Sequence, residues 1–253
     1  MSSIFLKELS INPDWEGFLT SGIRRAIIEI EKEVTKTKYT PTPEKVLRFL
    51  SVPLSSVKII ILGQDPYPQE GVATGRAFEV GALKSWNEPF NNISLKNILR
   101  SLYKAYSGRA IKYNELKTKF DNEFPILPPD KLFGHWEGQG VLLLNTYFTC
   151  EVGKPGSHKS IWGDFSLQLF RFISTFNGRI VWFLWGTHAI EYTRQLENIK
   201  AVTSMHPMMC FNKPGRETDF LYGEVNCFGQ YKDQINWTGY TLKEGFQPAR
   251  TLF

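Results

Sequence analysis

Short apolar runs recur along the chain at wide intervals. The first and third runs, residues 57–62 and 180–185, are nearly continuous and rich in β-branched or aromatic residues. Runs of this kind are typical of strands that are covered on both faces. We therefore predict four strands, at residues 57–62, 141–144, 180–185 and 201–205.

Between these runs, apolar residues recur every three or four positions, which predicts amphipathic helices. One helix is expected to begin at Ser94, whose hydroxyl suits an N-cap. Strands that alternate with helices favour an α/β fold, a three-layer α/β/α sandwich with a central, mainly parallel four-stranded sheet. The Pro-rich stretch 124–129 is typical of a loop within a single domain. The apolar positions of the three clearest helices are Ile23, Ala26, Ile27 and Ile30; Leu95, Ile98, Leu99 and Leu102; and Phe165, Leu169, Phe172, Ile173 and Phe176.

The composition is that of a globular protein. The chain has 253 residues, 42% of them hydrophobic and 22% charged, which is too apolar for a disordered chain. No run is long enough to span a membrane, and the first residues lack the layout of a secretory signal. We therefore expect an intracellular protein, cytoplasmic if the source is bacterial and nuclear if it is eukaryotic or viral.

Cysteine and histidine are too few and too scattered for a metal centre. Cys150, Cys210 and Cys227 form no CxxC pair, and the chain has only 4 histidines. This spacing matches neither a zinc nor an iron–sulfur pattern, so we expect no metal, no disulfide, and reduced, buried thiols.

The net charge of +5 is a modest positive bias that is compatible with binding to nucleic acid. By itself it decides little, because many basic proteins bind no DNA. The chain contains no dense block of Lys and Arg, so a phosphate-binding surface would have to be assembled from separate loops.

Polar residues follow the predicted strands at the points where each strand ends. Asp65 and Tyr67 follow the first strand, Asn145 ends the second, and His206 follows the fourth. Ligands of open parallel sheets collect at the carboxyl ends of the strands. If the strands are parallel neighbours, these side chains converge on one edge of the sheet.

Each of these residues also has a plain structural interpretation. Asp65 and Tyr67 both precede a proline, which stiffens the loop, but an Asp-Pro pair most often forms a tight turn. The amide of Asn145 matches either a nucleobase edge or the neighbouring backbone, and we weigh the two equally. His206 lies next to a proline and is more often structural, and Phe78 would ordinarily be counted in the core. Taken singly, none of them decides a function.

The order of the motifs resembles that of the family 1 uracil-DNA glycosylases. The segments are GQDPY at 63–67, Phe78, GVLLLNT at 140–146, Ser-His at 157–158, LWG at 184–186 and His-Pro at 206–207. The resemblance covers about residues 57–207, with further matches at 94–98 and 153–158 and a faint echo at 234–237. It implies one glycosylase-like domain over residues 1–237 and a C-terminal tail, 238–253, that is disordered or docks on the body.

The resemblance implies an enzyme that flips deoxyuridine out of DNA and hydrolyses its N-glycosidic bond, releasing uracil and leaving an abasic site. Asp65 would stabilise the oxocarbenium-like sugar and activate water. His206, as a neutral imidazole, would donate a hydrogen bond to the leaving uracil anion.

It also implies how the base would be recognised. Asn145 would read the uracil edge and exclude cytosine, and Phe78 would stack on the ring. Tyr67 would occupy the place of the thymine methyl group, and Gln64 would contribute its backbone. No cofactor and no metal are implied.

Contacts to the DNA backbone are implied for Ser94, Lys154, Ser157 and His158. The alternative is that Ser94 only caps its helix and that residues 156–157 only turn the chain. The expected partners are uracil-containing single- or double-stranded DNA and proteinaceous inhibitors or repair proteins; we expect a monomer that binds no membrane.

The chain departs from the family pattern most clearly after His206. The family has a phosphate-binding Ser and an intercalating Leu there, whereas this chain has Met208 and Cys210 at those positions. The apolar wedge candidates are Met209, Cys210 and Phe211, and the sequence does not choose among them. Two further departures are Pro68 in place of a His and the loss of prolines around 88–92. Residues 212–229 match poorly.

Two other functions compete with an active uracil-DNA glycosylase. One is a DNA-binding relative without enzymatic activity, whose altered loop no longer flips bases. The other is a related glycosylase with a different base preference. Retention of Asp65 and His206 argues against the first, and Tyr67 with Asn145 argues against the second.

Overall fold

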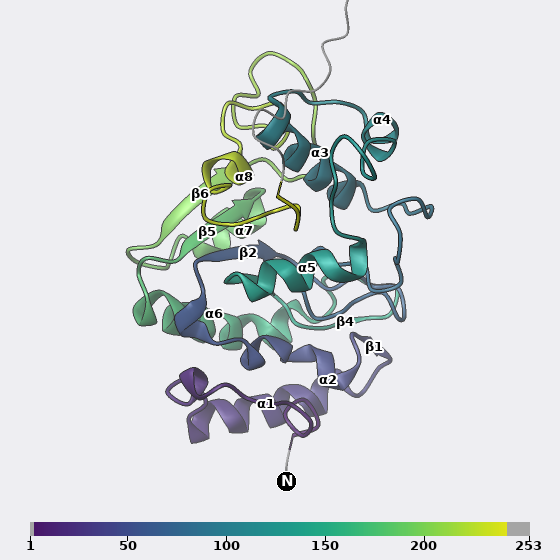
Figure 1. Ribbon diagram of the computed structural model, residues 1–253. Helices are drawn as coiled ribbons and strands as arrows, with labels where there is room; N and C mark the ends of the chain where they lie inside the picture. Colours follow the sequence, from purple (N-terminus) through teal and green to yellow (C-terminus); the bar gives the residue numbers. More distant parts are fainter. Residues whose placement is uncertain (1–2, 242–253) are drawn as a thin grey trace, which may run out of the picture. The chain divides into compact units, whose positions relative to one another are not determined.

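Four strands form one sheet (Figure 1). The computed structural model describes residues 3–241. The strands are β2 (Ile59–Gly63), β3 (Val141–Asn145), β5 (Val181–Trp185) and β6 (Lys200–Ser204), in the order β3-β2-β5-β6. Strand β2 pairs in parallel with both β3 and β5. The predicted strands and the predicted α/β class are confirmed.

Both faces of the sheet are covered. Ile60 and Leu62 of β2 belong to a large apolar core, and the alternate residues Ile59 and Ile61 are equally buried. Because successive side chains of a strand point to opposite faces, burial of both sets requires cover on both sides. This is the arrangement of the predicted three-layer sandwich.

The chain divides into two compact units. The first contains the chain up to Ala82 together with Gly140–Leu184 and His188–Val202, and the second contains Leu83–Gln139, Trp185–Thr187 and the chain from Thr203 onward. The single domain over residues 1–237 stays a prediction.

In the first unit, two long helices pack against each other, α1 (Ser21–Val34) and α6 (Lys159–Phe176). The Thr20 hydroxyl caps α1 by accepting from the N–H of Ile23 at 3.3 Å. The expected apolar faces are buried through Ile27 in α1 and Leu169 in α6. The remaining elements here are 3-10 helices η1 (Pro13–Trp15), η2 (Arg48–Ser51) and η3 (Leu54–Ser56), helices α2 (Pro43–Val46) and α7 (Thr187–Thr193), and the antiparallel pair β1 (Tyr39–Thr40) and β4 (Cys150–Glu151).

The second unit is built from α3 (Ile93–Ser107), α4 (Tyr113–Lys117), α5 (Pro129–Gly138) and α8 (Cys227–Gln230). Helix α3 begins at Ile93 with Asn92 at the cap position, so the prediction that Ser94 is the N-cap is wrong: Ser94 lies in the first turn. The N–H of Leu127 donates to the carbonyl oxygen of Thr238 at 2.8 Å, which holds the first residue of the predicted tail against this unit. Residues 242–253 of that tail lie outside the described residues.

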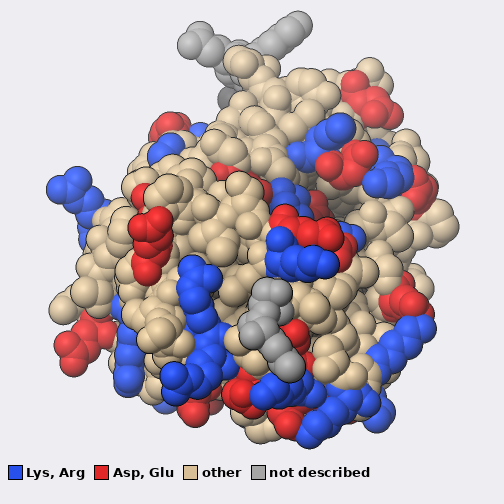
Figure 2. Space-filling view, turned by 90° about the horizontal axis from the view of Figure 1, so that it is seen from below, with Lys and Arg blue, Asp and Glu red and all other residues tan. Residues whose placement is uncertain are grey.

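Charged side chains of both signs are mixed on the surface. Figure 2 shows Lys and Arg among Asp and Glu side chains on the face seen from below, and no single basic block. On α1, Lys32 pairs with Glu29 at 2.7 Å, and Lys36, just after the helix, pairs with Glu33 at 2.7 Å. None of the described helices is long and apolar enough to cross a membrane.

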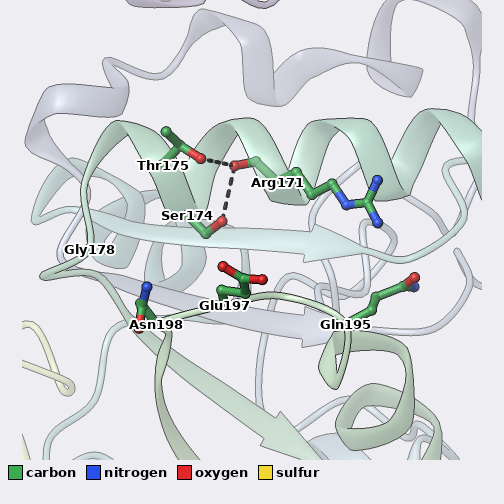
Figure 3. A pocket seen from close by; sticks show the side chains of 7 residues that line it. All are labelled: Arg171, Ser174, Thr175, Gly178, Gln195, Glu197 and Asn198. Carbon is green, nitrogen blue, oxygen red and sulfur yellow. Dashed lines mark hydrogen bonds between the residues drawn. The ribbon is translucent and has the colours of Figure 1, made fainter.

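A pocket of about 600 Å³ opens in the first unit between the end of α6 and the segment before β6 (Figure 3). The hydroxyls of Ser174 and Thr175 are turned to the carbonyl of Arg171, at 3.0 and 2.9 Å. Gly178 precedes β5 and Asn198 precedes β6, so this pocket lies at the amino ends of the strands. None of the residues predicted to act on a ligand lines this pocket.

Candidate active site

The ends of β2 and β3 bring two of the predicted segments together in the first unit. Gly63 and Asn145 are partners in the parallel register. The carbonyl of Gly63 accepts from the N–H of Thr146 at 2.9 Å, and that of Gln64 accepts from the N–H of Tyr147 at 2.9 Å. The loop that carries Asp65 therefore runs beside the residues that follow Asn145.

The side chain of Asn145 is buried, 4% exposed, and lies against Gly63. A Cβ atom on residue 63 would meet Asn145 Oδ1 at a distance below any that real Cβ atoms show, and it would lie 3.0 Å from the Cβ of Ala77. The amide of Asn145 and the segment that leads to Phe78 thus meet at Gly63, where any added side chain would displace the amide.

Phe78 has an unusual backbone conformation. Its φ of 65° lies in the left-handed region, which bulky residues rarely adopt. The hydroxyl of Tyr67 donates to the carbonyl of Phe78 at 3.4 Å. On either side of Phe78, Arg76 and Glu79 form an ion pair at 3.1 Å with both side chains largely buried. Phe78 and Tyr67 are thus neighbours, and the strain points to a functional use of the ring.

Asp65 has a buried carboxylate oxygen, Oδ1, that has no hydrogen-bond partner among the described residues. Burial raises the pKa of Asp65, although the N–H of Gly156, the Gln64 side chain and the charge of Lys159 oppose that rise. A buried carboxylate oxygen without a donor costs free energy, and such groups are concentrated at functional sites.

The loop from 151 to 158 uses its polar groups internally. The Ser157 hydroxyl accepts from the N–H of Glu151 at 2.8 Å, and Lys154 pairs with the Glu151 carboxylate at 2.6 Å. This geometry agrees with a chain-turning role for Ser157, and the exposed ammonium group of Lys154 stays accessible to an anion.

His158 is buried, 3% exposed, in a chain of hydrogen bonds. The indole N–H of Trp162 donates to the Thr149 hydroxyl at 2.7 Å, and that hydroxyl contacts His158 Nδ1 at 2.8 Å. The Thr149 hydroxyl has one proton and two acceptor lone pairs, so beside the bond from Trp162 it can serve a neutral His158 in either tautomer. Burial lowers the pKa of His158, which favours this neutral form.

His206 belongs to the second unit and packs against Gly186. Gly186 has a φ of 90°, and a Cβ atom there would lie 2.9 Å from the Cβ of His206. The N–H of Met208 donates to His206 Nδ1 at 3.2 Å, so Nδ1 is the acceptor and Nε2 carries the proton. Burial lowers the pKa of His206. The imidazole is therefore a neutral hydrogen-bond donor through Nε2.

The loop after His206 exposes most of its apolar side chains. Met208, Met209 and Phe211 are 53%, 49% and 45% exposed. Cys210 is turned inward instead, and its thiol donates to the carbonyl of Pro207 at 3.2 Å. The side chain of Cys210 is thus already engaged within the protein.

A hydrogen-bond network missed by the sequence interpretation anchors the His-Pro turn to α3. The Asn97 amide donates to the carbonyl of Pro207 at 2.6 Å, and Arg100 donates to Asn97 Oδ1 at 2.7 Å. Arg100 also donates to the Tyr222 hydroxyl at 2.7 Å. The available signal was Asn97 itself, because an amide among the apolar positions of a helix must have a buried partner.

The chain is similar to known proteins over most of its length. The family model "Uracil DNA glycosylase superfamily" matches residues 51–227. Uracil-DNA glycosylase 1 of Listeria monocytogenes serotype 4b (strain F2365) is 32% identical over 224 residues, which are 85% of this chain and 91% of the relative. The crystal structure of mimivirus uracil-DNA glycosylase has a TM-score of 0.66 at 22% identity and matches 91% of this chain and 85% of that chain. A mimivirus variant solved in complex with UGI has a TM-score of 0.67 at 22% identity, over 91% of this chain and 87% of that chain.

Proposed function

Because the chain belongs to the uracil-DNA glycosylase superfamily, we propose that it removes uracil from DNA by hydrolysing the N-glycosidic bond and leaves an abasic site. The observation that carries the proposal is Asp65, whose buried Oδ1 atom has no partner at the end of β2. A base inside a duplex is out of reach, so the nucleotide must first be flipped out, at a cost of about a few kcal/mol.

Asp65 acts as the catalytic carboxylate in this proposal. As the glycosidic bond breaks, positive charge develops on the sugar and is stabilised by the nearby carboxylate, while Oδ1 orients and deprotonates the attacking water. The stiff Asp-Pro loop fixes the carboxylate before the substrate arrives.

His206 stabilises the leaving group. Negative charge builds on uracil O2, and the Nε2–H of the neutral imidazole donates to it. A preorganised donor of this kind contributes about 3 kcal/mol to the lowering of the barrier. The N–H of Met208 supports this role because it occupies Nδ1 and so fixes the tautomer.

Recognition of the base is assigned to the first unit. Asn145 accepts from uracil N3–H and donates to O4, Phe78 stacks on the ring, and Gln64 contributes its backbone. Tyr67 fills the space that the thymine methyl group needs. The contact between Tyr67 and Phe78 supports this assignment, since it holds the excluding ring and the stacking ring together.

Ser94, Lys154, Ser157 and His158 are proposed to hold the DNA backbone. Lys154 supplies charge directly, whereas buried His158 acts by fixing the loop beside it. Because the net charge is +5, the affinity should fall as salt rises. The substrate is uracil-containing DNA, single- or double-stranded, and the protein acts as a monomer in the compartment that holds this DNA. Proteinaceous inhibitors are proposed by analogy with the mimivirus complex.

Met209 is the side chain we assign to the space left by the flipped base. Cys210 is turned inward, and the ring of Phe211 lies beneath the Arg216 guanidinium at 5.1 Å. Met209 is 49% exposed and its side chain is flexible, which suits insertion between bases.

The test uses a single-stranded oligonucleotide that contains one uracil, at moderate salt and with a chelator present. We expect free uracil and an alkali-labile strand from the wild-type protein, and a loss of at least about a thousandfold in turnover for Asp65→Asn with DNA binding retained. Salt-sensitive binding without any release of base would instead favour the DNA-binding relative.

A further inference from the structure

One buried carboxylate organises the segment after Pro207. Asp219 is 1% exposed. Its Oδ2 accepts from the N–H of Phe211 at 2.9 Å, and its Oδ1 accepts from the N–H groups of Leu221 and Tyr222 at 2.9 and 3.0 Å. Arg216 donates to Oδ2 through two nitrogens, at 3.1 and 2.9 Å. The carboxylate is therefore satisfied on both oxygens.

Arg216 extends this contact to the other side of the loop. Besides pairing with Asp219, its guanidinium donates to the carbonyl of Met209. The same guanidinium lies over the ring of Phe211, and Lys213 approaches that ring to 5.9 Å. Asp219 and Arg216 together thus bind the backbone on both sides of Cys210 and one aromatic side chain.

The loop held in this way has an exposed apolar tip. Met208 and Met209 project from a backbone that is fixed at Pro207 by Asn97 and at Phe211 by Asp219. Ordering a flexible loop costs conformational entropy, which binding must otherwise overcome. A loop that is already ordered presents its side chain without that cost.

We propose that Asp219 and Arg216 are positioning residues that hold residues 209–211 so that the side chain of Met209 enters the DNA stack when the target nucleotide leaves it. The proposal rests on the proposed function, since it assigns the pair to that same reaction. The charge state of Asp219 agrees with it. Burial works against the ionised form, but the hydrogen bonds from Phe211, Tyr222, Leu221 and Arg216 outweigh it and lower the pKa of Asp219, so this carboxylate stays ionised at neutral pH.

The role predicts a selective defect. A flipped base leaves a gap in a duplex but not in an already unstacked single strand, so the wedge matters only for duplex DNA. We expect Asp219→Asn to lower kcat/KM on a duplex with a U:A pair by at least about tenfold, and on the single strand by less than about twofold. Glu217→Gln is the matched control, because it removes the same charge from an exposed side chain nearby, and it should change neither value.

If Asp219→Asn does not fold, Arg216→Gln tests the positioning role instead. This variant should show the same selective loss of kcat/KM on duplex DNA. On duplex DNA, Met209→Ala combined with Asp219→Asn should be no worse than Met209→Ala alone, because both act through one side chain. Fluorescence of 2-aminopurine beside the uracil should show reduced flipping in the same variants.

Equal losses on both substrates, or additive losses in the double variant, would overturn the positioning role while leaving the glycosylase function intact. If the wild-type protein releases no uracil even from single strands, the proposed function itself fails and the wedge role falls with it.

Discussion

The side-chain oxygen of Asn145 occupies the space that a Cβ atom on residue 63 would need. The two residues are partners at the ends of β2 and β3, so the strand register itself brings the amide against the glycine. The consequence is that the position of the proposed uracil-reading amide depends on the absence of a side chain at residue 63.

Gly63→Ala should therefore damage base recognition and leave the fold in place. The added methyl group must displace Asn145 Oδ1, so we expect kcat/KM for uracil release to fall by at least about a hundredfold, comparable to a misplaced catalytic contact. Gly178→Ala is the matched control, because nothing lies within 4 Å of its Cβ position. Full activity of Gly63→Ala, with a normal melting curve, would show that Asn145 is not the reading group.

The tautomer of His206 is a second measurable consequence. The N–H of Met208 donates to Nδ1, and burial lowers the pKa of the imidazole, so it should be neutral with its proton on Nε2 at pH 7. Two-dimensional NMR of ¹⁵N-histidine-labelled protein should show this form, titrating below 6.5. Because the proposed mechanism uses the neutral ring, activity should fall as the pH is lowered through that pKa.

Met208→Pro removes the N–H donor, whereas Met208→Ala keeps it. The proline variant should show a fraction of the Nδ1–H tautomer and a reduced kcat, and the alanine variant should show neither. An identical NMR spectrum of the imidazole in both variants would mean that this hydrogen bond does not fix the tautomer.

Much of the fold could be predicted because it depends on local patterns. Continuous apolar runs identify buried strands, and the spacing of residues such as Leu169 and Ile27 identifies the helices. The start of α3 was misplaced because Ser94 has the chemistry of a cap while the chain turns at Asn92, two residues earlier. Propensity alone does not fix where a helix begins.

The site was less predictable, because its decisive features are non-local. The left-handed backbone of Phe78 is held by surrounding contacts that no spacing reveals. An Asp in a loop such as that of Asp219 is expected to be solvated, and only the backbone N–H groups that donate to it show its role. The sequence identified the site residues at the strand ends, but it did not identify the side chains that hold those residues in place.

Tyr67 provides a test of discrimination against thymine. If its ring fills the place of the methyl group, Tyr67→Ala should release thymine from single-stranded DNA, and the preference for uracil should fall by at least about tenfold. Tyr67→Phe keeps the ring and loses only the hydroxyl that contacts Phe78, so it should still reject thymine. Uracil release by Tyr67→Ala without any thymine release would disprove the steric mechanism.

Asp65→Asn should stabilise the protein while abolishing turnover. Burial raises the pKa of Asp65 above its usual 3.8, so the carboxyl group ionises less readily in the folded than in the unfolded state. At pH 7 the ionised carboxylate therefore lowers the free energy of unfolding. Each kcal/mol gained should raise Tm by about 2–4 °C. The gain should shrink as the pH falls through the raised pKa and vanish below 3.8, where both side chains are neutral.

Asp14→Asn should do the opposite, because a hydrogen bond from the N–H of Ser55 lowers the pKa of Asp14. Thermal melts of both variants at pH 7 and pH 4 should show a raised Tm for Asp65→Asn and a lowered Tm for Asp14→Asn. A lower Tm for Asp65→Asn at pH 7 would contradict the claim that the Asp65 carboxylate destabilises the folded protein.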